Sequence, residues 1–213
     1  MFLKIAKETL KGKTIVRALM NLELSKYTLS GKVLDIGGGD NPSYFRFFKD
    51  GDFNLINIDS RKGDNRIEIN LEKDKLPYDD NSANQVLILN VLEHIYNHKF
   101  VVGEIKRVLK NDGQIIGFVP FLVCVHPDPH DYFRYTGESL QKIFKEAGFN
   151  NIKIKEVGLG PFTAGFNTMA FIFPKFLRLF ALPFYYFLDK LVLIVRPKFN
   201  KKFPLGYLFI LRK

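Results

Sequence analysis

The chain has no tryptophan and a single cysteine, Cys124, among its 213 residues. One cysteine excludes an internal disulfide, so we expect a reducing compartment, the cytoplasm. Lysines interrupt the amino-terminal stretch MFLKIAKETLKGK, which therefore lacks the apolar centre of a secretory signal. Glycine, proline or charge also breaks the apolar runs before they reach the roughly 18 residues of a bilayer span, and we expect no transmembrane helix.

Acidic residues are scarce in one region of the chain. From Pro161 to Lys213 there are nine basic residues and one acid, Asp189, an excess of eight in a net charge of +10. Half of the phenylalanines, eleven of 22, lie in the same region. The positive charge therefore belongs to a hydrophobic segment and not to a solvated basic patch, which disfavours nucleic acid as a partner.

The segment Lys32–Tyr44, KVLDIGGGDNPSY, combines a strand with a glycine-rich turn. Val33, Leu34 and Ile36 predict a buried strand, and three glycines follow it directly. Such a corner binds ligands in open α/β sheets, because glycine lets the backbone approach a ligand closely. A dinucleotide fingerprint would place its third glycine at Pro42, so this turn does not fit that class.

Strand-like and helical patterns alternate along the rest of the chain, which favours an α/β fold. Two short amphipathic helices are expected within residues 2–29, with a break near Gly12. Further strands are predicted at 54–58, 66–71, 85–89, 114–119, 152–157 and 206–211, and further helices at 44–49, 101–109 and 136–147. Residues 110–113 are expected to end the second of these helices.

Asp59 follows the strand at 54–58, twenty residues beyond Gly39. A carboxylate at the carboxyl end of a strand can accept hydrogen bonds from both hydroxyls of an adenosine ribose. Alternatively, it caps a helix or a turn.

Several segments resemble one enzyme family. Asp35, Gly37 and Gly39 match the hydrophobic–Asp–hydrophobic–Gly–x–Gly motif of class I S-adenosylmethionine-dependent methyltransferases, and Asn41 stands where many members have a further glycine. Leu92-Glu93-His94 and the run EIKRVLKNDG after Gly103 match later segments of the same family. The resemblance covers residues 32–120 and concerns the small-molecule, methyltransferase-11-like members.

This resemblance implies a Rossmann-like fold with a seven-stranded, mostly parallel sheet, an antiparallel last strand and helices on both faces. It implies an enzyme that uses S-adenosylmethionine and releases S-adenosylhomocysteine. The methyl group would pass to an oxygen or nitrogen of a small or lipid-linked acceptor. The residues expected to bind the cofactor are Asp35, Gly37, Gly38, Gly39, Asp59, Ser60, Asn70, Leu71 and Asn90.

Acceptor chemistry is expected in the loop PFLVCVHPDPHDYFRYT, residues 120–136. The loop resembles that of methyltransferases found with polysaccharide and lipid-linked glycan synthesis. The predicted catalytic residues are His126, His130 and Arg134. A histidine can take a proton from an acceptor hydroxyl, and an arginine can hold a carboxylate or phosphate. Alternatively, Asp131 and Arg134 pair and cap the next helix. No metal is expected, because the prolines spoil helical spacing and His126, His130 and Asp131 lack a clear fourth ligand.

The predicted domain organisation has three parts: amino-terminal helices (1–30), a methyltransferase core (31–157 and 205–213), and an insertion (158–204). In the insertion, Lys175, Arg178, Leu182, Tyr185 and Asp189 fall on one helical face and phenylalanine and leucine cover the rest, with breaks at Pro174 and Pro183. This composition suits a helix at a membrane surface, formed by 161–203, or a cradle for a lipid-linked acceptor. A homodimer interface or an extra core layer is the alternative.

Three other functions stay open at this stage. One is a nicotinamide- or nucleotide-binding protein on the same kind of sheet. Another is a protein at a membrane surface that keeps the nucleotide pocket without transferring methyl groups. The third is nucleic-acid methylation, which is disfavoured because no Asn-Pro-Pro-Tyr or Asp-Pro-Pro-Tyr segment follows the strand at 85–89.

Overall fold

The computed structural model describes residues 1–40, 42–61 and 63–213, so the expectation for Asn41 lies outside the described residues. The described chain forms one seven-stranded sheet in the order β3-β2-β1-β4-β5-β7-β6. β7 runs antiparallel to both of its neighbours, and the other neighbouring strands are parallel. The strands are β1 (Gly31–Ile36), β2 (Phe53–Asp59), β3 (Arg66–Glu68), β4 (Ala83–Leu89), β5 (Leu109–Pro120), β6 (Asn151–Val157) and β7 (Gly206–Arg212). The predicted fold class is confirmed.

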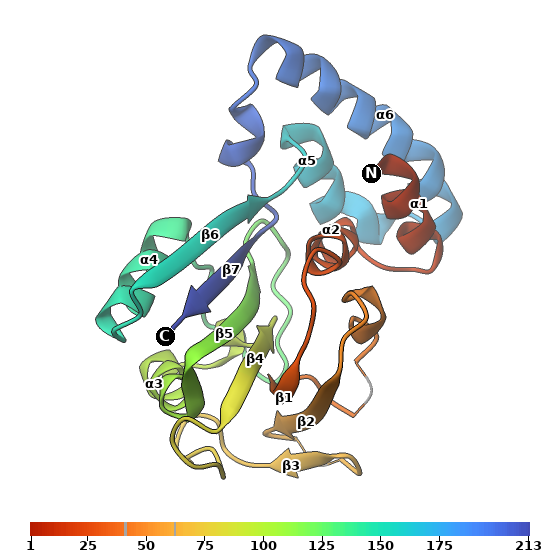
Figure 1. Ribbon diagram of the computed structural model, residues 1–213. Coiled ribbons are helices and arrows are strands. Elements are labelled where there is room, and N and C mark those ends of the chain that lie inside the picture. Colours follow the sequence, from red (N-terminus) through yellow and green to blue (C-terminus); the bar gives the residue numbers. More distant parts are fainter. Residues whose placement is uncertain (41, 62) are drawn as a thin grey trace.

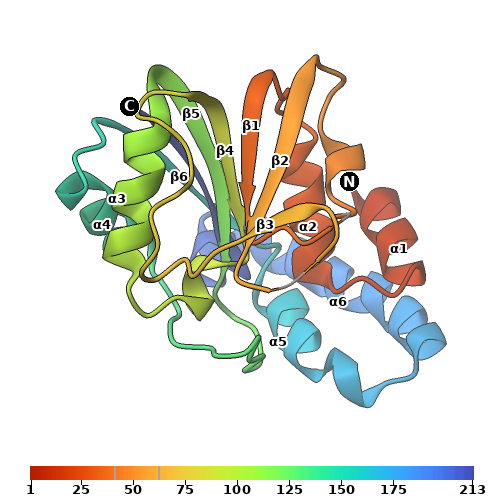
Figure 2. The same cartoon turned by 90° about the horizontal axis from the view of Figure 1, so that it is seen from below.

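Helices cover both faces of this sheet (Figures 1 and 2). On one face lie α3 (His98–Val108) and α4 (Gly137–Glu146). On the other lie α1 (Phe2–Leu10), α2 (Ile15–Leu24), α5 (Pro161–Met169) and α6 (Lys175–Val195). Short 3-10 helices connect the elements: η1 (Phe45–Phe47), η2 (Leu92–His94), η3 (Ala170–Ile172) and η4 (Phe199–Lys202).

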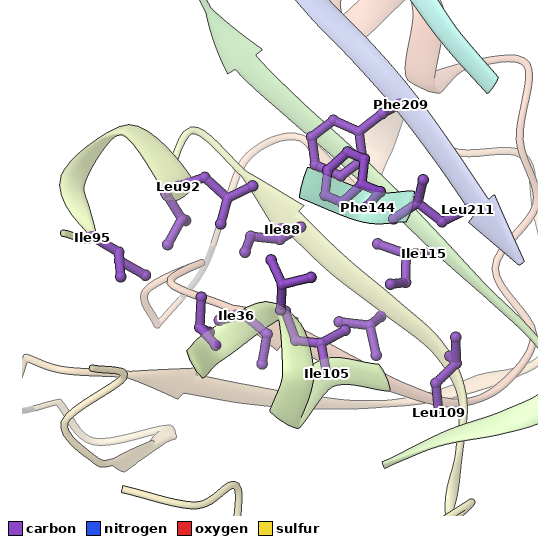
Figure 3. Packing of buried hydrophobic residues seen from close by; sticks show 14 of the residues in the cluster. Ile36, Ile88, Leu92, Ile95, Ile105, Leu109, Ile115, Phe144, Phe209 and Leu211 are labelled. Atoms are coloured by element: carbon purple, nitrogen blue, oxygen red, sulfur yellow. The ribbon is translucent and has the colours of Figure 1, made fainter. Parts of the chain in front are cut away.

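Each face of the sheet buries its own hydrophobic cluster, because side chains alternate along the strands. Under α3 and α4, Ile88 and Ile115 of the sheet pack with Ile105 and Phe144, as Figure 3 shows. On the opposite face, Leu87 and Ile116 pack with residues of α1, α2, α5 and α6. The strands are therefore buried on both sides, which explains their nearly continuous apolar sequences.

Three predicted elements have other limits in the structure. The helix expected at 44–49 is only the 3-10 turn η1, and β5 begins at Leu109, where residues 110–113 were expected to form a turn. The strand expected at 66–71 ends at Glu68, because the next residues form a turn: Asn70 Oδ1 accepts a hydrogen bond from the Glu72 amide over 3.0 Å. Such local side-chain bonds compete with strand pairing.

The order of the strands determines where a ligand can bind. β1 lies between β2 and β4, and the chain continues from β1 toward β3 on one side and from β4 toward β5 on the other. Open α/β sheets bind ligands in the crevice at such a reversal, beside the carboxyl ends of the strands. The glycine turn after β1, Asp59 at the end of β2 and Asn90 after β4 all lie at this edge.

The helix α6 differs from expectation in two respects. It continues through Pro183, and three residues of the predicted polar stripe are turned toward the protein: Leu182 and Asp189 are buried, and Tyr185 packs against the core. Asp189 accepts hydrogen bonds from the amides of Phe162 and Thr163, both over 2.9 Å, and from the Thr163 hydroxyl over 2.6 Å. The one acid of this region thus caps the first turn of α5 and holds α6 against it.

We expect Asp189→Ala to lower the free energy of unfolding by about 2–3 kcal/mol, because three donors at the start of α5 lose their acceptor. Urea denaturation measures the change. Asp112→Ala, at an exposed position on β5, serves as the control and should stay within about 0.5 kcal/mol of the wild type. Equal unfolding midpoints for the two variants would contradict the structural role of Asp189.

Candidate functional site

The turn after β1 requires glycine at each of its three positions. Gly37 and Gly39 have φ angles of 75° and 74°, which side chains other than glycine rarely adopt. A Cβ atom at Gly38 would overlap the carboxylate of Asp35 and lie 2.6 Å from the Tyr44 hydroxyl. The turn therefore presents bare backbone at the reversal point of the sheet.

Asp35, in β1, lies beneath this turn and is fully buried. Its Oδ2 accepts a hydrogen bond from the Tyr44 hydroxyl over 2.5 Å, whereas its Oδ1 has no hydrogen-bond partner among the described residues. Burial raises the pKa of Asp35 to about 7, and the charge of Asp59 adds to this, while the Tyr44 hydrogen bond and Arg17 oppose it. The guanidinium of Arg17, in α2, lies 5.3 Å from the centre of the Tyr44 ring.

A cavity of about 780 Å³ opens at the carboxyl ends of β1, β2 and β4. It holds most of the residues that the sequence assigns to cofactor binding, brought together from separate segments. Those that line it are Gly37, Asp59, Ser60, Asn70, Leu71 and Asn90. We call it the first cavity.

The carboxylate of Asp59 in the first cavity is engaged by Arg61. The Arg61 Nη2 atom donates to Asp59 Oδ2 over 2.9 Å, and Nη1 of the same side chain reaches Asp128 of the 120–136 loop over 3.0 Å. A ribose at Asp59 would have to share the carboxylate with Arg61 or displace it. Arg61 is not among the site residues predicted from the sequence. The signal that could have identified it is a basic residue two positions beyond the acid that ends a strand.

Two predicted cofactor residues have local roles as well. Asn70 closes the turn after β3 through its side-chain oxygen, which retains a second lone pair. Asn90 has a φ angle of 56°, and its amide donates to Phe118 of β5 over 2.8 Å. Its side chain lies where the first cavity meets a second one.

This second cavity, of about 810 Å³, extends from the glycine turn toward α2 and the 120–136 loop. Arg17 of α2 lines it, and so do His94 and His126. Residues of α5 and η3, Asn167 and Phe171, also form part of its wall. Residues of the segment 158–204, which the sequence predicts to be an insertion, therefore contribute directly to this cavity.

His126 faces a carboxylate that the sequence did not identify as its partner. Glu93 is fully buried, and its Oε1 lies 3.6 Å from His94 Nε2 and 3.8 Å from His126 Nε2. Neither oxygen of Glu93 has a hydrogen-bond partner within the described chain. The facing carboxylate raises the pKa of His126, although partial burial opposes the rise.

The other two predicted catalytic residues are placed differently. His130 is exposed at the rim of the first cavity, where its ring lies 5.2 Å from that of Tyr132. Arg134 pairs with both oxygens of Asp131, over 2.5 and 2.6 Å, and holds the pKa of that carboxyl well below its usual range. The structure thus shows the Asp131–Arg134 pair, while the cap of α4 is the Thr136 hydroxyl, which accepts from the Ser139 amide over 3.2 Å.

Asp131 and Arg134 together hold the backbone of the 120–136 loop. Asp131 Oδ2 accepts from the amide of His126 over 2.9 Å, and Arg134 Nη2 donates to the carbonyl of Cys124 over 3.2 Å. The pair therefore fixes the chain on both sides of Val125 and so positions His126.

Residues 34–117 match the family model described as a methyltransferase domain. A protein of Methanocaldococcus jannaschii, described as uncharacterized protein MJ0638, is 33% identical over 135 residues, which are 57% of this chain and 47% of that protein. The chain thus spans about half the length of the curated relative that it matches.

Solved structures show the same fold. An S-adenosylmethionine-dependent methyltransferase from Archaeoglobus fulgidus superimposes with a TM-score of 0.60 at 15% identity, over 92% of this chain and 94% of that one. Phosphoethanolamine N-methyltransferase 2 of Haemonchus contortus, solved with S-adenosylmethionine, gives a TM-score of 0.54 at 16% identity, over 91% and 52% of the two chains. At 15% and 16% sequence identity, the similarity to these structures shows a shared fold.

The buried carboxyl of Asp35 predicts a pH-dependent stability of the ligand-free protein. Its pKa of about 7 lies above the ordinary value of 3.8, so the folded protein keeps a proton that the unfolded chain releases between these values. Relative to Asp35→Asn, the wild type should therefore lose stability as the pH rises from about 4 to about 7, by on the order of 4 kcal/mol. Urea unfolding of both proteins at pH 5, 6, 7 and 8 measures this difference, and parallel pH profiles would contradict it.

Proposed function

On the premise that this chain is a class I methyltransferase, by its fold and by the match of residues 34–117, we propose that it transfers the methyl group of S-adenosylmethionine to an oxygen or nitrogen of a lipid-linked acceptor at a membrane surface. The observation that carries this proposal is the convergence of the predicted cofactor residues on the first cavity, with the second cavity adjoining it at Gly37 and Asn90.

The donors and acceptors around the glycine turn fit S-adenosylmethionine. The unpartnered oxygen of Asp35 can accept from its ammonium group, and Arg17 can pair with its carboxylate. Gly37–Gly39 allow its methionine part to approach the backbone, while Asp59 can hold the ribose and Asn70 the adenine amino group. When bound, the cofactor supplies a methyl group on a sulfonium, which already carries its leaving group.

The task of the protein is then to align the acceptor and to hold its reacting atom. We assign the acceptor to the second cavity, against His94 and His126, whose rings face the buried carboxylate of Glu93 on their other side. His130 lies at the rim and is proposed to contact the acceptor there. Arg134 acts as a positioning residue, since it reaches His126 through Asp131 and the loop backbone.

The outer face of α6 supports a membrane-bound acceptor. Large apolar side chains on it are exposed, among them Phe180 (76%), Phe187 (57%) and Ile194 (75%). Soluble proteins rarely expose so many in one patch. Of the helices in the described part of the chain, none has the length and hydrophobicity needed to cross a bilayer. The composition instead fits a helix that lies flat in the membrane interface.

Charge around the outer face of α6 favours anionic lipid over a second protein copy. Exposed lysines and arginines flank it, from Lys4 and Lys7 of α1 to Lys198, Lys201 and Lys202 after α6. α1 lies beside α6, with the Phe2 and Tyr186 rings 5.1 Å apart (Figure 1). The only acid of residues 161–213, Asp189, is buried. A second copy would bring two like-charged surfaces together, whereas anionic headgroups neutralise them.

The apolar surface also continues to the second cavity. Phe171, in η3, is 61% exposed and lines that cavity, and α6 begins a few residues later. A lipid-linked acceptor could therefore keep its lipid in the membrane while its head group enters the second cavity.

Calorimetric titration tests the cofactor. We expect S-adenosylmethionine and S-adenosylhomocysteine to bind once per chain, and NAD not to bind. Asp59→Ala should weaken this binding about 10- to 100-fold, because each hydrogen bond from a ribose hydroxyl to a charged carboxylate contributes about 1.5 kcal/mol or more. Asp79→Ala, at an exposed site remote from the cavity, is the matched control. Folded protein that binds neither sulfur compound would refute the proposed function.

Vesicle flotation tests the membrane surface. The double variant Phe180→Asp, Phe187→Asp should bind vesicles of phosphatidylglycerol and phosphatidylcholine at least about tenfold more weakly than the wild type, because it removes apolar contact and adds negative charge. The control variant, Asn111→Asp with Gln141→Asp, carries the same change of charge at exposed positions of β5 and α4.

Two results would overturn this assignment. In one, both variants bind vesicles with the same affinity as the wild-type protein does. In the other, sedimentation shows a wild-type dimer that only the α6 variant loses, which would assign the face to a second copy. If the wild-type protein binds vesicles, methyl transfer is tested next. A lipid extract incubated with the protein and S-adenosylmethionine should then yield a product that is heavier by one methyl group.

A further inference from the structure

The Glu93 carboxylate lies in an environment that leaves it unsatisfied. The side chain is fully buried, and among the residues described neither of its oxygens receives a hydrogen bond. A buried carboxylate without donors or a counter-charge costs several kcal/mol, and natural proteins compensate for it with a cation. The groups that face Glu93 should therefore show which cation it takes.

Two imidazoles face Glu93 with the same edge. His94 Nδ1 lies 2.5 Å from the carbonyl oxygen of His130, and His126 Nδ1 lies 2.9 Å from that of Cys124. A carbonyl oxygen only accepts, so each of these contacts is a hydrogen bond when Nδ1 carries the proton. Arg134 Nη2, which only donates, lies 3.3 Å from His126 Nδ1, but the Cys124 carbonyl is the nearer partner and favours a protonated Nδ1. In the neutral imidazole, Nε2 then has a lone pair, and in both rings Nε2 is the atom turned toward Glu93.

Protons alone satisfy this arrangement poorly. One proton on His126 would pair that ring with Glu93, but the lone pair of His94 Nε2 would still face a carboxylate oxygen 3.6 Å away. A second proton on His94 would place two cationic rings side by side, with their centres 5.2 Å apart, and a proton on Glu93 itself could be donated to only one of the two Nε2 lone pairs. A single metal ion between the three groups would satisfy both lone pairs and the carboxylate together.

The distances suit such an ion. The ligand atoms of Glu93, His94 and His126 all lie within 4.8 Å of one another. An ion about 2.1 Å from each ligand in tetrahedral geometry requires separations of roughly 3.4 Å. The observed 3.6 and 3.8 Å from Glu93 Oε1 to the two Nε2 atoms meet this requirement after shifts of a few tenths of an ångström. The two histidine nitrogens lie within 4.8 Å of each other and must also approach to about this separation when the ion binds.

We propose that Glu93, His94 and His126 bind a divalent transition-metal ion, with Zn²⁺ as the best match to two imidazoles and one carboxylate. Three protein ligands leave at least one coordination position open, as in catalytic zinc sites. Backbone carbonyls hold the far nitrogen of each ring, which is the usual support of metal-bound histidine. The Asp131–Arg134 pair adds a further support, because it fixes the loop that carries His126.

These three ligands differ from the set His126, His130 and Asp131 that the sequence of the loop suggested. His130 offers its carbonyl and not its ring to the cluster, and Asp131 is engaged by Arg134. Glu93 replaces them from η2, a different part of the chain. His126 would accordingly serve as a ligand and not as a base.

The position of the site connects it to the acceptor, a step that rests on the proposed function. His94 and His126 line the second cavity together with Gly37 and Asn90, so an open coordination position would face the space next to the cofactor turn. An ion there would hold an oxygen of the acceptor, such as a hydroxyl or carboxylate, and would favour the deprotonated form of a hydroxyl.

Metal binding can be tested on the tag-free full chain after treatment with a chelator. Competition between the protein and a chromophoric chelator measures the affinity for Zn²⁺, and the visible absorption of Co²⁺ reports its coordination. We expect one ion per chain, bound at micromolar concentration or below. His94→Asn, His126→Asn and Glu93→Gln should each weaken it on the order of 100-fold, because each removes one ligand of three.

The control variant is His130→Asn, which removes an imidazole from the same loop but no ligand atom and should bind metal like the wild type. Wild-type protein that binds Zn²⁺ no more tightly than the three ligand variants would overturn the proposal, as would the absence of a Co²⁺ absorption band. Titration of metal-free protein with S-adenosylhomocysteine separates the two ideas: binding of that compound without metal binding refutes the metal site alone, and binding of neither refutes the proposed function as well.

Discussion

The close approach between the turn Gly37–Gly39 and the buried carboxylate of Asp35 is the constraint on which the site depends. Gly38 must lack a side chain because Asp35 and the Tyr44 hydroxyl occupy the space in which its Cβ would lie. β1 carries Asp35 at the centre of the sheet, between β2 and β4. The turn is thereby held at the one edge where the ends of three parallel strands and their polar residues meet.

The two cavities beside this turn are built from different interactions. The first lies at the ends of buried strands, whose positions the hydrophobic clusters on both faces of the sheet determine. The second depends on the 120–136 loop, which polar contacts hold: the Asp131–Arg134 pair, the His94 ring on the carbonyl of His130, and the Tyr132 amide on the carbonyl of Glu93 over 2.8 Å. These contacts place His94 and His126 beside the carboxylate of Glu93, whose oxygens have no hydrogen-bond partner among the described residues.

The helix α6 shows how a buried acid can orient an amphipathic segment. Asp189 is stabilised in the interior by hydrogen bonds from the first amides of α5, which have no acceptor within their own helix, and by the favourable helix dipole. The phenylalanines on the remaining circumference are then left outside, with lysines and arginines around them. A hydrogen bond in the interior thus determines which face of α6 meets the surroundings of the protein.

The amino-acid sequence by itself determined the α/β fold and the order of nearly all its elements, and it selected most of the residues that gather at the first cavity. These features follow from local patterns: apolar runs of strand length, a glycine turn directly after a strand, and an acid at the end of the next strand. Only the tertiary structure decided that Arg61 engages Asp59, that Arg134 turns to Asp131, and that Glu93 and His94 meet His126. The contacts of Arg61 and Arg134 join residues two and three positions apart, whereas the contact between Glu93 and His126 joins two distant segments at the edge of the sheet. Each of these groups had several possible partners of suitable charge. Spacing along the chain cannot choose among such partners, because the choice depends on which groups burial leaves without water.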